Sequence, residues 1–341
     1  MSLLSRLTAI VIITLAPVTA AAQGPAYRVE ELAGGLRAPW SLAFLPDSSL
    51  LIVEKHGTIR RYRGARLDSL PVGGGPTHVL QRSDGGLLDI VLDPAFATNR
   101  QVYLSFVEGT VESNRTALFR ARWNGAGLEE GQVIFRATPA KRGLAHPGGR
   151  LAWLPDGTLL LSIGDGYDYR DAALALGSDL GKLVRLTREG RPASDNPFVT
   201  TPGARPEIYS YGHRNQQGLL VDPRNGEVWA HEHGPKGGDE INRIRPGANY
   251  GWPRTTFGID YDNTVISPIA EAPGIERPVV IWVPSIAPSG FALYLGTRFP
   301  AWDRRLLHWR VGRETSPAGP DPPRAAGRGR TAPRRAWPPD S

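Results

Sequence analysis

The sequence predicts an all-β fold, and three observations favour a β-propeller within that class. A short unit recurs along the chain: an apolar strand, a turn rich in Pro, Asp and Gly, and a second apolar strand. The 40 glycines and 31 prolines among 341 residues favour many short elements joined by tight turns. Helical patterns are few. Repeated antiparallel units of this kind are typical of propeller blades, whose loops converge on a central axis.

Each copy of the unit predicts two neighbouring antiparallel strands, and a third strand is predicted after the first copy. The spacing of the copies is uneven, so a sandwich of unrelated hairpins stays open as an alternative. The fifth copy is the least regular. In order, the predicted segments are 41–47 with 50–54 and 58–62, 87–94 with 101–107, 151–157 with 158–163, 218–223 with 227–231, and 290–296.

The first 22 residues are expected to be a secretory signal peptide. Arg6 precedes an apolar run over 7–18, and alanines at 20–22 supply a small-residue cleavage site. The run is too short for a comfortable membrane span, so a membrane anchor is the less favoured alternative. We therefore expect a periplasmic or secreted protein with no stable membrane span after cleavage. Because the chain has no cysteine, closure of the fold or a bound ion must replace disulfides.

The net charge of +7 does not predict nucleic-acid binding, because most of it lies at the C-terminal end. Residues 303–341 hold nine arginines and four acidic residues, which is +5, and this leaves +2 for the rest. The same segment holds seven prolines and no repeat unit, so it cannot bury enough apolar surface to offset its ordering entropy. We expect a propeller domain over 23–302, followed by a tail over 303–341 that is disordered or comes from a shifted reading frame.

Two polar loops that flank the repeat copy at 151–163 are candidates for acid–base chemistry. His146 lies in a Pro- and Gly-Gly-containing turn before this copy, where a neutral imidazole suits a general base. Asp165 lies in a Gly-Asp-Gly turn after it and can orient His146 and stabilise its protonated form. A solvated loop histidine and a simple Asp-Gly turn are the alternatives.

Two further loops follow between residues 209 and 253. Arg214 can stabilise charge that develops on an oxyanion or a hydride acceptor, unless it is buried in an ion pair with Glu207 or Glu232. Segment 234–242 combines a Gly-Pro turn with the carboxylate pair Asp239 and Glu240. Backbone carbonyls and carboxylates are hard-oxygen ligands, which suit Ca²⁺ better than zinc.

Taken together and in this order, these motifs resemble the soluble, pyrroloquinoline quinone (PQQ)-dependent glucose and aldose sugar dehydrogenases, the glucose/sorbosone dehydrogenase family. The resemblance covers about residues 36–302. The motifs that carry it lie at 86–89, 93–96, 146–150, 164–165, 181–186, 195–197, 212–215, 217–218, 234–235, 239–242 and 249–253.

The resemblance implies a six-bladed propeller with PQQ and Ca²⁺ at its axial mouth, which oxidises aldose sugars at C1 to the lactone. His146 would take the proton of the anomeric hydroxyl, with Asp165 as its partner. Arg214 would polarise the quinone carbonyl that accepts hydride. Asn215 and Gln217 match cofactor contacts. An external electron acceptor would complete the cycle.

The family pattern also implies calcium ligands and a substrate rim. The carbonyls of Gly234 and Pro235 match ligands of a cofactor-side Ca²⁺. Glu240 and the Tyr250 carbonyl match a second, structural calcium site. Trp282 and the loop that contains Ser285, residues 284–289, fall where the family places its substrate rim.

Two departures from the family keep other functions open. Asp84 stands at a cofactor-facing position where the family usually has Gln, and a carboxylate there would repel an anionic quinone. The family's last blade, with its cationic residues, has no match in 303–341, so we expect that blade to be missing or disrupted, which would expose two sheet edges. A non-catalytic propeller that binds sugar or protein is the main alternative. A calcium-dependent lactonase is the second.

Overall fold

The computed structural model describes residues 30–310 and the short strand at 324–325. The expected signal peptide and most of the expected tail lie outside the described residues. The chain divides into two units, Met1–Glu30 and Glu31–Ser341, and all the described strands lie in the second. None of the helices among the described residues has the length and apolar character needed to cross a membrane.

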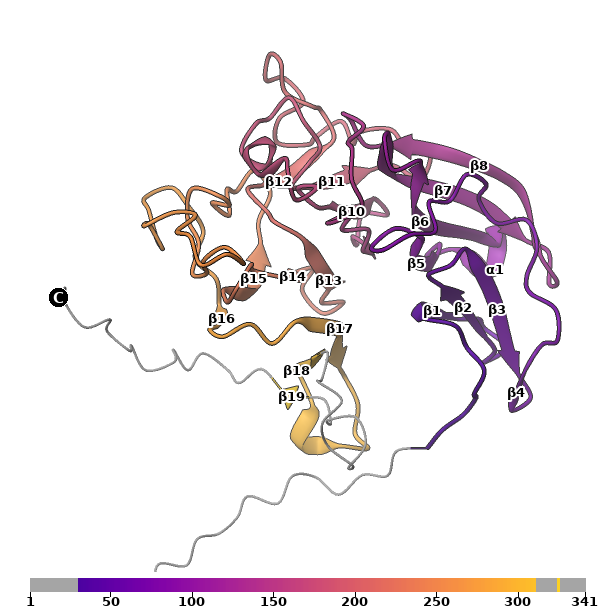
Figure 1. The fold of residues 1–341 in the computed structure, drawn as a ribbon. Helices are drawn as coiled ribbons and strands as arrows, with labels where there is room; N and C mark the ends of the chain where they lie inside the picture. The colour runs from indigo at the N-terminus through magenta and orange to yellow at the C-terminus, as the bar shows by residue number, and fades with distance from the viewer. Residues whose placement is uncertain (1–29, 311–323, 326–341) are drawn as a thin grey trace, which may run out of the picture. The chain divides into compact units, whose positions relative to one another are not determined.

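Five antiparallel sheets follow one another along the described chain (Figure 1). The first contains β1 (Pro39–Phe44), β2 (Leu50–Glu54), β3 (Thr58–Arg63) and β4 (Arg66–Leu67). The second contains β5 (Leu87–Leu92), β6 (Gln101–Gly109), β7 (Asn114–Trp123) and β8 (Leu128–Arg136). The third contains β9 (Leu151–Trp153), β10 (Leu159–Ile163), β11 (Lys182–Leu186) and β12 (Ile208–Tyr211). The fourth contains β13 (Gln216–Val221), β14 (Val228–Glu232), β15 (Asp239–Ile244) and β16 (Val280–Trp282). The fifth contains β17 (Pro288–Tyr294), β18 (Arg305–Arg310) and β19 (Arg324–Ala325).

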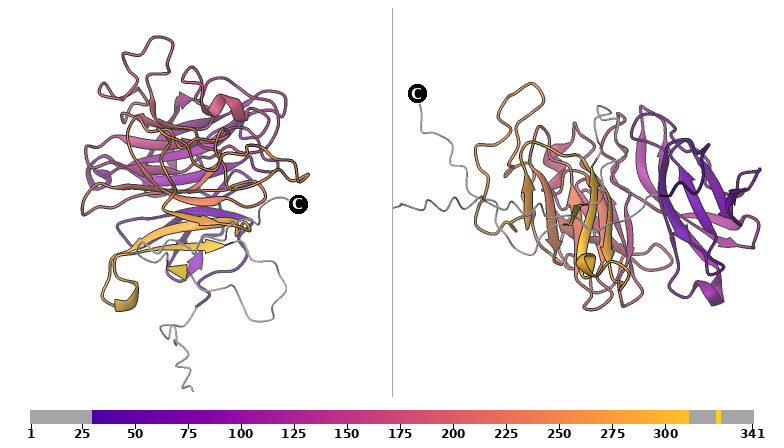
Figure 2. Two further views of the ribbon diagram at one scale, coloured as in Figure 1. Left: turned by 90° about the vertical axis from the view of Figure 1, so that its left-hand side faces the viewer. Right: turned by 90° about the horizontal axis from the view of Figure 1, so that it is seen from below.

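The first strands of successive sheets contact one another in order. β1 lies against β5, β5 against β9, β9 against β13, and β13 against β17. Within each sheet the strands then follow in sequence order. Figure 2 shows the same ribbon from two further sides, with the strands of a sheet lying next to one another. This is the arrangement of propeller blades. The prediction of an all-β propeller is confirmed, with four four-stranded blades and a three-stranded fifth sheet among the described residues.

The repeat seen in the sequence corresponds to the inner strands of the blades. The predicted strands 50–54 and 158–163 match β2 and β10 almost residue for residue. Inner strands such as β2 and β10 are covered on both faces by neighbouring blades, so they are mostly apolar. Outer strands such as β8 have one exposed face, and their mixed composition gave no clear signal.

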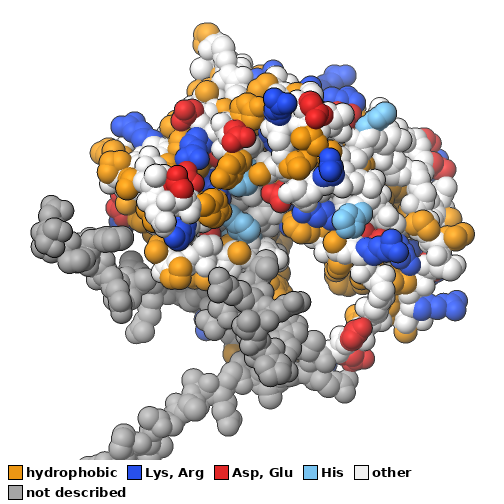
Figure 3. All heavy atoms as spheres, in the orientation of Figure 1, with side chains coloured by type: hydrophobic (Ala, Val, Ile, Leu, Met, Phe, Trp, Pro, Cys, Tyr) orange, Lys and Arg blue, Asp and Glu red, His pale blue; other side chains and the backbone are white. Residues whose placement is uncertain are grey.

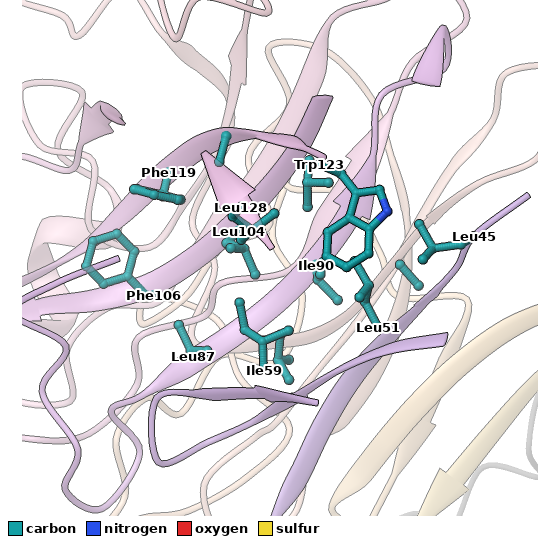
Figure 4. Packing of buried hydrophobic residues seen from close by; sticks show 14 of the residues in the cluster. Leu45, Leu51, Ile59, Leu87, Ile90, Leu104, Phe106, Phe119, Trp123 and Leu128 are labelled. Atoms are coloured by element: carbon teal, nitrogen blue, oxygen red, sulfur yellow. The ribbon is translucent and has the colours of Figure 1, made fainter. Parts of the chain in front are cut away.

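The hydrophobic core is divided among the spaces between neighbouring blades. The first cluster joins the first and second sheets through side chains such as Leu51, Ile59, Leu87 and Leu104 (Figure 4). Further clusters join the second to the third sheet and the third to the fourth. Full burial of each large apolar side chain contributes roughly 1.5–3 kcal/mol. The blades therefore hold the loops at their ends in fixed positions.

A buried lysine fixes the loop before β11. The Lys182 side chain has no exposed surface, and its Nζ donates to the carbonyl oxygens of Ala172, Ala173 and Leu180 at 2.7, 2.9 and 2.8 Å. These three bonds satisfy all three donors of the ammonium group.

We predict that Lys182→Met lowers the free energy of unfolding by about 3 kcal/mol or more, because three buried carbonyls lose their donor. Urea denaturation measures the change. Lys236→Met, at an exposed lysine, is the matched control and should stay within about 0.5 kcal/mol of the parent. Equal effects of the two substitutions would contradict this role of Lys182.

The fifth sheet includes part of the segment that the sequence placed in the tail. Arg305–Arg310 pair with β17 as β18, so regular structure continues beyond residue 302. At the other end of the series, Leu42 and Phe44 of β1 are 48% and 70% exposed. Both alternate with Ala43, which packs into the first core cluster. The face of β1 that points away from the second sheet therefore presents apolar side chains to solvent.

Candidate active site

The loop before β9 holds His146 in a constrained conformation. His146 has a left-handed backbone with φ of 51°, and its side chain is almost buried. Gly148 follows with φ of 67°, and a Cβ there would lie 2.8 Å from the backbone nitrogen of Gly164. Only glycine fits this close approach. The Pro-Gly-Gly sequence after the histidine therefore packs its loop directly against the loop that carries Asp165.

Asp165 is the partner of His146, as the sequence predicts. The His146 Nδ1 lies 2.7 Å from Asp165 Oδ1. The same oxygen accepts a hydrogen bond from the Tyr167 backbone N–H at 2.8 Å, and Oδ2 accepts one from the Trp252 Nε1–H at 2.7 Å. The Asp165 side chain has no exposed surface.

The hydrogen bonds keep Asp165 ionised. Burial alone would raise the pKa of Asp165, but the hydrogen bond from His146, the Tyr167 N–H and the charge of Arg214 lower it below 3.8. A carboxylate can only accept, so His146 Nδ1 must carry a proton. In a neutral ring this leaves Nε2 without a proton, which is the state that a general base needs.

Arg214 lies beside this pair, in the segment after β12. The backbone N–H of Asp165 donates to the Arg214 carbonyl at 2.8 Å. The Arg214 side chain is 4% exposed, and its Nη1 donates to the carbonyls of His233 and Gly234 at 3.0 and 2.8 Å. Its Nε–H is buried and has no partner among the described residues. The site therefore offers a buried cationic donor that the chain itself does not satisfy.

The structural alternative for Arg214 is wrong. Glu207 pairs with Arg205, with 2.6 Å between the carboxylate and the guanidinium. Glu232 accepts from the backbone N–H of Arg214 at 2.7 Å and also contacts His213, but it forms no ion pair with the Arg214 guanidinium in the described structure. The guanidinium thus has two carbonyl partners and the Tyr261 hydroxyl, which lies 3.5 Å from Nη2.

Asn215 and Gln217 join the base loop to the start of β13. The Asn215 Oδ1 accepts from the Gly148 N–H at 3.2 Å and from the Gln217 Nε2 at 3.0 Å. Both side chains are buried. Between them, Gln216 has no exposed surface and neither amide atom has a partner among the described residues. The structure thus places both predicted cofactor contacts next to His146 and Arg214.

Asp84 reaches the same loop from the second blade. Its Oδ2 accepts from the His146 backbone N–H at 3.3 Å. Two lysines, Lys55 and Lys141, interact with the Asp84 charge. Burial lowers the pKa of both lysines, and the negative charge of Asp84 acts in the opposite direction. The positive charges of these two lysines therefore partly compensate the charge of the Asp84 carboxylate.

Comparison with known proteins decides the family. A family model described as Glucose / Sorbosone dehydrogenase matches residues 36–309, which is more than half of the chain. The chain belongs to the glucose/sorbosone dehydrogenase family. The aldose sugar dehydrogenase YliI of Escherichia coli is 41% identical over 286 residues, which are 82% of this chain and 76% of that protein.

Solved structures of similar proteins agree with this family. A crystal structure of glucose dehydrogenase has a TM-score of 0.79 and 40% identity, and the match covers 87% of this chain and 88% of that one. The PQQ-bound form of an aldose sugar dehydrogenase from Streptomyces coelicolor has a TM-score of 0.67 and 32% identity, with 87% and 84% covered.

Asp239, predicted as a metal ligand, also holds a neighbouring loop in this glucose/sorbosone dehydrogenase. Its buried carboxylate accepts four hydrogen bonds, which come from the backbone N–H of Gly234, the Ser285 hydroxyl, and the N–H groups of Ile286 and Ala287, at 2.7 to 2.9 Å. Oδ1 accepts the bond from Gly234 and Oδ2 accepts the other three, so Oδ1 keeps a free lone pair and the role of Asp239 as a metal ligand stays a prediction. Through Oδ2, Asp239 anchors the loop that contains Ser285, which the resemblance placed at the substrate rim.

We predict that Asp239→Asn lowers the free energy of unfolding by about 2 kcal/mol, because an amide cannot accept on both sides and hydrogen bonds to a charged group are strong. Chemical denaturation measures the loss, and faster proteolytic cleavage within 284–289 reports the loosened loop. Asp262→Asn, at an exposed turn, is the control. A loop as resistant as that of the parent would show that Asp239 does not hold it.

Trp282, the other predicted rim residue, ends β16. Its ring lies 4.9 Å from the ring of His308, and its carbonyl accepts from the Gly238 N–H at 2.8 Å. It therefore borders the same loop system as Ser285. On the face seen in Figure 3, histidine side chains come to the surface near the middle of the described part.

Glu232 and Glu240 border a small cavity next to Arg214. The cavity has a volume of about 20 Å³, and Tyr250 and Gly234 also line it. This is room for about one water molecule or ion. Burial and the charge of Glu232 raise the pKa of Glu240 well above 4.5, although a hydrogen bond from Asn242 opposes them. Two carboxylates among backbone oxygens suit Ca²⁺.

Other features bear on where a ligand can bind. No cluster of three or more His, Cys, Asp or Glu arranged for a metal occurs within the described residues. A larger cavity of about 630 Å³ borders Arg61, Arg63 and Arg66 of the first blade, but none of the predicted site residues lines it. Cavity size therefore does not identify this site.

The sequence pattern does not predict the contacts of Trp252 or of the Glu232 carboxylate in the site. Trp252 is part of the motif at 249–253, which carries the resemblance but no local sign of a role. Glu232 stands between two histidines, where the sequence indicates only an ion-pair partner for Arg214. The Trp252 indole N–H donates to Asp165, and the Glu232 carboxylate accepts from the Arg214 backbone N–H. Both contacts join residues that lie far apart in the sequence.

Proposed function

We propose that this chain oxidises aldose sugars at C1 to the lactone in a reaction that depends on PQQ and calcium. The observation that carries the proposal is the 2.7 Å contact between His146 Nδ1 and Asp165, directly beside Arg214. A base with its orienting carboxylate and a buried guanidinium are thus combined in one site. Family membership supports the same class of reaction.

The chain's own residues account for the proton. Oxidation of a cyclic aldose removes the hydrogen on C1 as hydride and the hydroxyl proton on O1, which leaves the carbonyl group of the lactone. His146 Nε2 receives the proton, and ionised Asp165 stabilises the imidazolium that results. When bound, PQQ supplies the two-electron acceptor for the hydride. An external acceptor then removes the electrons.

Several residues fit a bound quinone and its calcium. Arg214, Asn215 and Gln217 would hold the cofactor, and the unpartnered Nε–H of Arg214 is a donor for one of its oxygens. The carbonyls of Gly234 and Pro235 would hold the cofactor-side Ca²⁺. Glu240 and the Tyr250 carbonyl would hold the second Ca²⁺ at the small cavity. The PQQ-bound relative supports the choice of cofactor.

The finer architecture and the location are also proposals. We infer a six-bladed type of propeller in which the last blade is missing or disrupted, because β1 presents Leu42 and Phe44 to solvent on the face that a further blade would cover. The signal-like start at 1–22 supports a periplasmic or secreted location.

Asp84 favours the non-catalytic alternative. Its carboxylate lies at the base loop, where an anionic quinone would meet like charge. A propeller with this change binds sugar or protein without oxidising it.

Reconstitution separates the two functions. Purified chain with PQQ and Ca²⁺ should reduce a redox dye only when an aldose is added, and the lactone should be detected as product. No sugar-dependent reduction from a folded sample, together with calorimetric sugar binding, would favour the binding protein. In that case Asp84→Gln tests whether the Asp84 charge prevents quinone binding. The substitution should restore binding, as measured by absorbance titration.

A further inference from the structure

Trp252 makes two contacts that join the two halves of the site. Its indole Nε1–H donates to Asp165 Oδ2 at 2.7 Å. The face of the same ring lies 5.4 Å from the Cζ of Arg214. The side chain is 6% exposed, and the backbone N–H of Trp252 is fixed by the Gly212 carbonyl at 2.9 Å. One rigid ring thus contacts both the carboxylate behind the base and the guanidinium.

The indole N–H completes the donor set around Asp165. Oδ1 already accepts from His146 and from the Tyr167 N–H, and Trp252 is the one described side chain that donates to Oδ2. Indole is a donor only, so Oδ2 is the acceptor in this bond. Without this bond a buried carboxylate oxygen would be left unsatisfied, and the carboxylate would be free to rotate away from His146.

From these contacts we propose that Trp252 is a positioning residue for the base: through Asp165 it holds His146 with its proton on Nδ1 and with Nε2 free. The effect of this residue on catalysis rests on the proposed function. The contact itself does not, because the chain makes it without cofactor. The ring also stacks on Arg214, and such a cation–π contact keeps the guanidinium at a fixed distance from Asp165.

Trp252→Phe tests the proposal because it keeps an aromatic ring against Arg214 and removes the N–H donor, and the loss of ring volume that comes with it is matched by the control. Trp153→Phe is the matched control: its indole N–H donates to the Leu92 carbonyl at 2.8 Å, between the second and third blades. In the chain without cofactor, ¹⁵N NMR of the imidazole should show the Nδ1–H tautomer in the parent and in Trp153→Phe. Trp252→Phe should show a mixture of tautomers.

The reconstituted enzyme supplies a second readout. Trp252→Phe should lower kcat by about 10- to 100-fold with KM within about twofold, because the base is misplaced while sugar binding is retained. Trp153→Phe should change thermal stability but not kcat. A pure Nδ1–H tautomer and an unchanged kcat in Trp252→Phe would overturn the proposal.

Asp165→Ala serves if Trp252→Phe does not fold, since it leaves the indole in place. The Nε1–H resonance of Trp252 should then lose its downfield shift, whereas that of Trp153 stays unchanged. An unmoved Trp252 resonance would show that the contact is not made. If the parent lacks aldose oxidation but the tautomer changes as expected, the proposed function fails and the positioning role stands.

Discussion

Replacement of His146 by Gln is expected to reduce the kcat for aldose oxidation by about 10³-fold, within the range for loss of a general base. Gln has a similar reach and polarity but cannot take a proton at neutral pH, so the hydroxyl proton has no acceptor. Steady-state dye reduction with PQQ and Ca²⁺ measures the change.

The control for this substitution is His56→Gln. His56 lies exposed in the turn between β2 and β3 and should leave kcat unchanged. Quinone binding by His146→Gln, followed by absorbance, should stay near that of the parent, which separates lost chemistry from lost cofactor. A full rate in His146→Gln would mean that another group is the base.

Calcium is expected to raise the melting temperature of the chain by about 5–10 °C at a concentration 100 times its dissociation constant. The reason is the pair of carboxylates at the small cavity. Burial and the charge of Glu232 raise the pKa of Glu240 above 4.5 in the folded chain. The folded state therefore binds more protons than the unfolded state above that pH.

The pH dependence follows in sign from this shift. Without calcium, the stability from protonated Glu240 is present below about pH 4.5 and is lost as pH rises through the higher folded-state pKa. A bound Ca²⁺ compensates the negative charges of Glu232 and Glu240, so the chain should no longer lose this stability as the pH rises. Melting curves between pH 4 and 8, with Ca²⁺ and with chelator, measure it.

Glu240→Gln distinguishes this site from other effects of calcium. The neutral amide should make the calcium-free chain more stable at neutral pH and remove most of the response to Ca²⁺. Glu271→Gln, at an exposed carboxylate, is the control. An equal response in the parent and in Glu240→Gln would place the ion elsewhere.

The sequence was sufficient to predict the inner strands and the convergence of the main site residues. Inner strands carry an apolar signal because neighbouring blades cover both faces, and His146, Asp165 and Arg214 stand at strand ends that a propeller gathers. Outer strands such as β8 carried no comparable signal, because only one of their faces is covered.

The roles of Asp239 and Trp252 could not be predicted from the sequence. A carboxylate beside a Gly-Pro turn looks the same whether it binds an ion or a loop, and its partners Ser285 and Ala287 lie 46 and 48 residues away. The indole N–H of Trp252 reaches a carboxylate 87 residues away. Such contacts depend on how the blades meet, which no local pattern records.

A crystal structure of the chain with Ca²⁺ and PQQ tests the central claim most directly. We expect the quinone between His146 and Arg214, with His146 Nε2 facing it and Nδ1 still bonded to Asp165. A quinone bound away from these two residues, or a His146 ring whose Nε2 faces Asp165, would contradict it.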